Sequence, residues 1–235
     1  MRRTLILDFD GTVCLGDGPA LAYARGLAAA HPELADLEHR VARHLAGDAV
    51  AEFAGAADGY QAVQSAAVRR GVEPSAIQNA FHAARRLLSK EGLGVHTPDG
   101  FADWAVRVRR AGAEILLVTN APAAGLDGVL RLLGIEDSFD RVVADAGKPE
   151  GMHAVLDDVA ARNGPITPGT VLSVGDIWVN DLSVPHARTA ATALIDPHGR
   201  QAGTPDVRVG SFTDLYMWSE AWAHGTAAGE PESSA

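Results

Sequence analysis

The chain has 235 residues, 47% of them hydrophobic, which is enough for one sizeable α/β domain or for a core domain with a smaller inserted one. Its 20 basic and 30 acidic residues give a formal net charge of -10, so the surface as a whole would repel nucleic acid and anionic lipid. We therefore expect no nucleic-acid partner and no membrane association. The single cysteine, Cys14, cannot form an intramolecular disulfide and is expected to be a small buried apolar residue of a cytoplasmic protein.

The first predicted element is a short apolar strand at residues 5–7, which ends in Asp8. Asp8 and Asp10 stand two residues apart in an extended chain, so their carboxylates can project to the same side. Carboxylates this close repel each other unless a cation or a shared proton relieves the repulsion, and Mg²⁺ is the natural partner for such oxygen ligands. Gly11 lets the backbone turn sharply away.

Residues 15–96 contain helical patterns and no strand pattern. The alanine-rich stretches that predict helices are 21–30, 35–45, 60–70 and 76–88. Pro32 and Pro74 stand where helices can start, while Gly92, Gly94 and Pro98 mark the return to the core. A block of this kind, inserted after the first strand, predicts a small helical cap.

The rest of the chain alternates between strand and helix patterns. Strands are predicted at 115–118, 141–144, 171–174, 191–195 and 207–209, and helices at 101–108, 152–162 and 182–188. This alternation predicts a doubly wound, Rossmann-like parallel sheet with right-handed crossovers.

Polar residues follow the predicted strands at the edge where ligands bind in such sheets. Thr119 and Asn120 offer a hydroxyl and loop amides to an anionic oxygen, and Lys148 offers a positive charge. Asp176 and Asp181 follow the next strand and add two carboxylates where a metal would lie. Acidic ligands, a hydroxyl and a lysine at one edge are typical of phosphoryl transfer, in which catalysis is mainly positioning and charge neutralisation.

The motifs Asp8-Phe9-Asp10-Gly11-Thr12, Thr119, Lys148-Pro149 and Gly175-Asp176 with Asn180-Asp181 resemble the four ordered motifs of the haloacid dehalogenase-like (HAD) superfamily. Each is a weak signal alone, but in this order, each at the end of a predicted strand, they are a strong one. The expected organisation is a Rossmann-like core of residues 1–14 and 97–224, a helical cap of 15–96 and a disordered tail of 225–235.

The resemblance implies a covalent mechanism. Asp8 would attack phosphorus to give an aspartyl-phosphate, which water then hydrolyses. Asp10 would act as general acid on the leaving oxygen and then as general base on the water. Thr119 and the Asn120 amide would hold the phosphoryl oxygens, and Lys148 would neutralise charge and steady Asp8.

The resemblance also implies the cofactor, Mg²⁺. The Asp8 carboxylate, the Asp10 main-chain carbonyl and Asp176 would bind it, with Asp181 either contributing through water or lying one layer out. Two departures from the family pattern lie next to this metal site. Ile177 and Trp178 follow Asp176 where the family often has small residues, and a run containing Pro185 replaces the usual glycine-containing one.

Asp10 favours phosphate esters, because dehalogenases of this superfamily need no acid for a leaving alcohol and lack that carboxylate. A cap inserted after the first strand favours a small phosphorylated metabolite as the partner. The predicted function is therefore that of a magnesium-dependent phosphatase of HAD type. The protein is expected to be a monomer or a homodimer. The alternatives are a phosphomutase or phosphotransferase on the same core, and a non-catalytic phosphate-binding regulatory protein.

Outside the core motifs, the sequence says less. Cap residues that could select the substrate are His31, His39, Arg40, His44, Gln61, Arg69, Arg70, His82, Arg85, Arg86 and Lys90. The pairs Arg69-Arg70 and Arg85-Arg86 are expected to be solvated charges near helix C-termini. Near the end of the chain, Phe212, Leu215, Trp218 and Trp222 have helical spacing and are expected to pack against the core.

Overall fold

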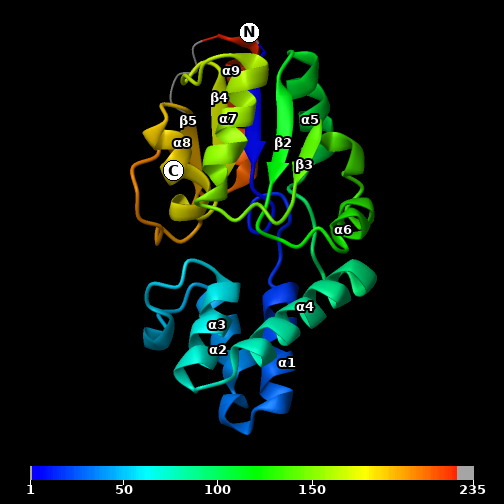
Figure 1. The fold of residues 1–235 in the computed structure, drawn as a ribbon, viewed down its shortest axis with the longest axis vertical. Coiled ribbons are helices and arrows are strands. Elements are labelled where there is room, and N and C mark those ends of the chain that lie inside the picture. The colour runs from blue at the N-terminus through cyan, green and yellow to red at the C-terminus, as the bar shows by residue number, and fades with distance from the viewer. Residues whose placement is uncertain (1, 227–235) are drawn as a thin grey trace. The chain divides into compact units, whose positions relative to one another are not determined.

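A computed structural model describes residues 2–226 of the chain (Figure 1). These residues form two compact units, which we describe separately. The first contains residues up to Leu15, Thr97–Leu126 and the chain from Leu133 onward, and the second contains Gly16–His96 with Asp127–Leu132. The predicted disordered tail falls, from residue 227 on, outside the described residues.

The first unit is built on a six-stranded parallel sheet with strand order β3-β2-β1-β4-β5-β6. The strands are β1 (Thr4–Leu7), β2 (Glu114–Val118), β3 (Arg141–Val143), β4 (Val171–Gly175), β5 (Ala191–Ile195) and β6 (Val207–Val209). Every residue of β1, β2, β4 and β5 is buried, as the continuous apolar runs predict for strands covered on both faces. The doubly wound, Rossmann-like fold class is confirmed.

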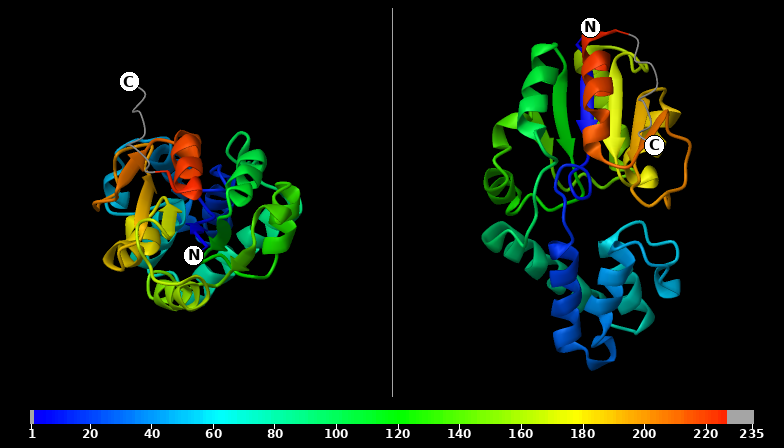
Figure 2. Two further views of the ribbon diagram at one scale, coloured as in Figure 1. Left: turned by 90° about the horizontal axis from the view of Figure 1, so that it is seen from above. Right: turned by 180° about the vertical axis from the view of Figure 1, so that it is seen from behind.

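Helices cover both faces of this sheet. They are α5 (Phe101–Arg110), α7 (Gly151–Asn163), α8 (Ser183–Ala187) and α9 (Tyr216–His224). Figure 1 shows α7 in front of the sheet, and the view from behind in Figure 2 shows α9 in front of it. Since β1 is central and its neighbours β2 and β4 run parallel to it, their carboxyl ends meet at one edge of the sheet.

Each face of the sheet has its own apolar core. Ile6 and Leu116 pack with Met152 and Leu156 of α7 on one face. On the other face, Trp104 of α5 stacks on Tyr216 with ring centroids 5.4 Å apart. Phe212, Leu215 and Trp222 are buried and Trp218 is half-buried, so the C-terminal apolar stripe packs inward as expected.

The second unit is helical. It contains α1 (Gly18–Ala30), α2 (Leu37–Leu45), α3 (Gly59–Arg69) and α4 (Pro74–Glu91), together with most of α6 (Leu126–Leu132). Its apolar core includes Leu27, Val41, Phe53 and Val63. Among the described residues, no helix is both long enough and apolar enough to cross a bilayer.

The boundary of the helical unit differs from the predicted cap at one place. Residues Asp127–Leu132 group with it, although the sequence assigns them to the core. The reason is local packing on α4: a Cβ placed on Gly92 would lie 3.2 Å from the Leu132 side chain, and one on Gly128 would lie 3.7 Å from Ser89. The position of these residues between β2 and β3 predicts that they belong to the core, but chain order does not show which unit they pack on.

Candidate active site

Asp8 follows β1 directly and is held at the carboxyl edge of the sheet by its main chain. Its N–H donates to the carbonyl of Val174 at 3.0 Å. The chain then turns tightly, because the carbonyl of buried Phe9 accepts from the amides of Val13 at 2.9 Å and Cys14 at 2.8 Å. Asp10 lies in this turn, half-buried, and its main chain forms a β-bridge with Cys14. Cys14 is buried, as the sequence predicts.

Lys148 joins two of the predicted carboxylates. Its Nζ donates to Asp8 Oδ1 at 2.6 Å and to Asp181 Oδ1 at 2.7 Å. The side chain of Lys148 is only 2% exposed, and that of Asp181 is 3% exposed. Charge-assisted hydrogen bonds shielded from water are strong, so the three groups form one buried electrostatic unit.

The same unit shifts the pKa values of Lys148 and Asp181. Burial alone would lower the pKa of the Lys148 ammonium, but the charges of Asp8 and Asp181 outweigh it and the net shift is upward. Burial and the nearby Asp8 charge raise the pKa of Asp181 to about 7, against the opposing effect of Lys148. Lys148 is therefore a permanent cation near neutral pH, while Asp181 titrates there.

Asp181 is fixed by local chain geometry. It lies in a π-helical turn, Trp178–Leu182, and its Oδ2 accepts the Ile177 amide at 2.9 Å. Its carbonyl accepts the Ser173 hydroxyl at 2.8 Å. Gly175 permits the close approach, since a Cβ at that position would lie 2.6 Å from Asp181 Cγ. The two carboxylate oxygens of Asp181 thus both accept hydrogen bonds, Oδ1 from Lys148 and Oδ2 from Ile177.

The carboxylates of Asp8, Asp176 and Asp181 each offer one oxygen, and these oxygens lie within 4.8 Å of one another. Gly11, at φ 90°, leaves room for Asp176, because a Cβ there would clash with its carboxylate. An all-oxygen, carboxylate-rich donor set suits a hard divalent cation such as Mg²⁺. The residues present therefore fit a metal, and the Asp10 side chain is not one of the three converging carboxylates.

Thr119 directly follows β2 and is 1% exposed. Its Oγ1 accepts the Ala121 amide at 2.9 Å, which tightens the loop after the strand. A hydroxyl that accepts a hydrogen bond still has its own hydrogen to donate. Thr119 can therefore serve an anionic oxygen while it shapes the loop that carries it.

The Asn120 side chain contacts Lys148, which the sequence does not predict. Its Oδ1 accepts the Lys148 amide at 2.7 Å, and its Nδ2 donates to the Lys148 carbonyl at 3.1 Å. From the sequence, only the main-chain amide of Asn120 is expected to contribute to the site. A side-chain amide beside a strand end is a general hydrogen-bonding group, and its partner 28 positions away is visible only in three dimensions.

The structure explains one departure from the family pattern. Trp178 packs against Gly203, at φ 105°, in the loop after β5, where a Cβ would collide with the indole. Its ring also lies 5.4 Å from that of His186. The loop is tied at its start by Asp196, which accepts the Arg200 amide at 2.9 Å and pairs with Arg208. The large residue after Asp176 thus braces the neighbouring loop.

Several cap residues from the sequence prediction have partners inside the helical unit. Glu52 pairs with Arg40 and with Arg70, and its carbonyl accepts from Arg69 at 2.7 Å. Arg85 is buried at 7% exposure and donates to the Tyr60 hydroxyl at 3.0 Å. The prediction of a solvated charge is wrong for Arg85, because helix position alone does not reveal which face the neighbouring helices cover.

The chain also resembles known proteins. A family model for haloacid dehalogenase-like hydrolases matches residues 2–185. No curated protein shows significant sequence similarity to the chain.

Solved structures share the fold over nearly their whole length. The magnesium-bound HAD-hydrolase YfnB from Bacillus subtilis has 18% identity and a TM-score of 0.63, covering 92% of this chain and 98% of that one. A predicted phosphoglycolate phosphatase from Haemophilus somnus 129PT has 18% identity and a TM-score of 0.63, covering 92% and 97%. L-2-haloacid dehalogenase from Xanthobacter autotrophicus, with chloropropionic acid covalently bound, has 17% identity and a TM-score of 0.55, covering 92% and 98%.

Proposed function

Because the chain belongs to the haloacid dehalogenase-like hydrolase family, we propose that this hydrolase is a magnesium-dependent phosphatase acting on a small phosphorylated metabolite. The observation that supports this most is the charge balance at the sheet edge. Three carboxylates and one ammonium carry a formal charge of -2 when ionised, which one divalent cation neutralises. Without that cation, an anionic nucleophile among carboxylates would repel a phosphate dianion.

Mg²⁺ would be held by the carboxylates of Asp8 and Asp176 and by the main-chain carbonyl of Asp10. When bound, it would polarise the phosphoryl group and offset the charge that builds up on its oxygens. Asp181, whose two carboxylate oxygens accept hydrogen bonds from Lys148 and Ile177, would act on it indirectly, as a negative charge beside the ion.

In the first chemical step, an Asp8 carboxylate oxygen attacks phosphorus and the bond from phosphorus to the ester oxygen breaks. Asp10 gives its proton to that departing oxygen, so the product leaves as an alcohol. Asp8 now carries the phosphoryl group as an aspartyl-phosphate. Lys148, at 2.6 Å from Asp8 in the resting site, orients the carboxylate for this attack.

In the second step, water attacks the aspartyl-phosphate and Asp10 accepts its proton. The phosphorus–Asp8 bond breaks, inorganic phosphate leaves and both carboxylates return to their first state. Thr119 and the main-chain amide of Asn120 would hold the phosphoryl oxygens through both steps, since both lie in the loop after β2 at this edge.

The first test is phosphate release from a panel of small phosphate esters with Mg²⁺ or with a chelator. We expect release to require Mg²⁺ and to be abolished in Asp8→Asn, which keeps the shape of the side chain but removes the nucleophilic charge. Asp10→Asn is expected to lower kcat by about 10²–10⁴-fold, the usual range for loss of a general acid–base.

A leaving group that needs no acid separates the two roles of Asp10. With p-nitrophenyl phosphate, Asp10→Asn should release a burst of nitrophenol and then only slowly release phosphate.

Other outcomes would identify other functions. Chloride release from a 2-haloacid without phosphate release would identify a dehalogenase. An aspartyl-phosphate cleared faster by an added sugar than by water would identify a phosphotransferase, and metal binding with no turnover on any ester would indicate a binding protein.

A further inference from the structure

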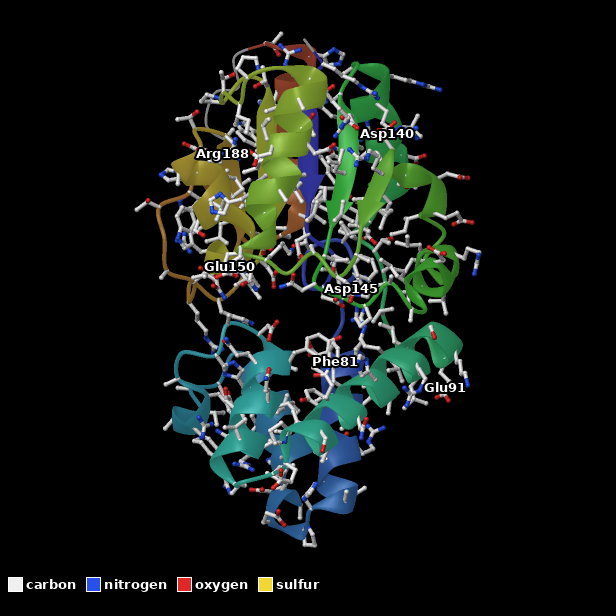
Figure 3. All side chains as sticks on the ribbon, in the orientation of Figure 1. Phe81, Glu91, Asp140, Asp145, Glu150 and Arg188 are labelled. Atoms are coloured by element: carbon white, nitrogen blue, oxygen red, sulfur yellow. The ribbon has the colours of Figure 1, made fainter. Side chains whose placement is uncertain are left out.

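The loops that follow β2 and β3 are bound to each other along their length. The Thr119 amide donates to the Val143 carbonyl at 2.9 Å, and the Ala146 amide donates to the Thr119 carbonyl at 3.0 Å. Asp145, labelled in Figure 3, donates its amide to Ala121 at 2.9 Å, and its Oδ2 accepts the Ala123 amide at 2.9 Å. The loop that carries Thr119 and the loop that carries Lys148 therefore form one braced piece.

The Asn120 side chain adds two hydrogen bonds to this brace, both to the main chain of Lys148, the residue that carries the ammonium of the site. An amide side chain has one acceptor and one donor group, which match the N–H and C=O of a main-chain residue. Asn120 uses both on Lys148, at 2.7 Å and 3.1 Å. Two hydrogen bonds from one rigid planar group fix both the position and the direction of the Lys148 main chain.

The Lys148 side chain needs such an anchor. A lysine stem has several rotatable bonds, so the placement of its ammonium depends on a fixed starting point. Here the ammonium must reach Asp8 and Asp181 at the same time, at 2.6 Å and 2.7 Å. Small displacements of a catalytic group lower rates strongly without abolishing substrate binding.

We propose that the side chain of Asn120 is a positioning residue, which holds the main chain of Lys148 so that its ammonium bridges Asp8 and Asp181. This inference rests on the proposed phosphatase function for its kinetic readout. It assigns the Asn120 side chain a task separate from the phosphate contact expected of the Asn120 main-chain amide.

The chain offers a matched control in Asn163. Its side chain also makes two hydrogen bonds, to Thr4 at 2.8 Å and to Glu114 at 2.7 Å, but at the amino ends of β1 and β2. Four residues of β1 separate the two ends, roughly 13 Å at the rise of a strand. Asn163→Ala therefore removes a similar pair of bonds away from the site.

The experiment compares Asn120→Ala, Asn120→Asp and Asn163→Ala with the natural chain. We expect Asn120→Ala to lower kcat by about 10–100-fold, the range seen when an orienting partner is lost, with KM for the ester changed less than about threefold. Asn120→Asp keeps the acceptor for the Lys148 amide and should fall in between. Asn163→Ala should lower the thermal midpoint while leaving kcat within about twofold.

Amide hydrogen exchange at Lys148 provides a readout that does not depend on turnover. It should speed up in Asn120→Ala and stay unchanged in Asn163→Ala, even if the natural chain hydrolyses no ester at all. The positioning role is overturned if Asn120→Ala leaves exchange at Lys148 unchanged. It is equally overturned if kcat falls no more than in Asn163→Ala, or if KM rises while kcat does not change.

Discussion

At the scale of single residues, the site depends on positions with no side chain. Gly175 ends β4 where the Asp181 side chain fills the space that a Cβ would occupy. The sequence identifies Gly175 only as part of a motif, because the space that it leaves open is used by a residue six positions later. Gly11 does the same for Asp176.

We predict that Gly175→Ala destabilises the protein by about 1–3 kcal/mol, the typical range for overpacking a tight core. Activity should fall as well, because Asp181 must move and Lys148 bonds to it. Urea unfolding and ester hydrolysis measure the two effects. Gly169→Ala is the control, since its Cβ would approach nothing closer than Thr167 at 3.9 Å, and equal effects in both variants would contradict the prediction.

At the scale of elements, three arginines, one in α2 and two at the end of α3, converge on one short segment. Glu52, whose side chain is 20% exposed, pairs with Arg40 of α2 and with Arg70 just after α3, and Arg69 bonds to its carbonyl. The network ties α2, α3 and the 3₁₀ turn Ala51–Phe53 together. From the sequence, these arginines are candidates for contact with substrate or with solvent, since ion pairs between helices leave no periodic signal.

We predict that Glu52→Gln lowers the free energy of unfolding by about 1–2 kcal/mol, between the values for exposed and buried ion pairs. Glu38→Gln removes one exposed pair, with Arg25 at 2.6 Å, and should cost less than about 0.5 kcal/mol. Chemical denaturation of both variants tests this. A Glu52→Gln protein as stable as Glu38→Gln would show that the network contributes no more than a surface pair.

The buried strands of the sheet are the elements that the sequence predicts best. The apolar runs of β1, β2, β4 and β5 match strands within one or two residues, because burial on both faces leaves a continuous hydrophobic signal. Asp8, Asp176, Asp181 and Lys148 meet because parallel strands present their carboxyl ends at one edge. The Asn120 contact and the Trp178 brace depend on loop conformations, which no periodicity encodes.

At the scale of the whole molecule, the buried charges link stability to pH. The pKa of Asp181 is raised to about 7 in the folded, metal-free protein, from an ordinary value of 3.8. The folded state therefore holds a proton that the unfolded state releases between these values. This contribution to stability is complete below about pH 4, declines as the pH rises and is lost above about pH 7.

Mg²⁺ should reverse that loss. A divalent cation binds best when the carboxylates around it are ionised, and Asp181 lies beside the two that would hold it, so binding competes with protonation at Asp181. We predict that the rise in Tm caused by Mg²⁺ is larger at about pH 8 than at about pH 5.5. Thermal melts at matched ionic strength measure it, and Asp181→Asn should flatten the dependence. An equal rise at both pH values would contradict the coupling.

The division of the chain between its two units also limits how the protein can be taken apart. Residues Asp127–Leu132 belong to the helical unit although the sequence on both sides of them belongs to the sheet unit. The polypeptide therefore passes between the units four times, and an expression fragment of 16–96 would lack the segment that packs on Gly92 and Ser89. A chimera that exchanges helical units between relatives must accordingly exchange two stretches of the gene, not one.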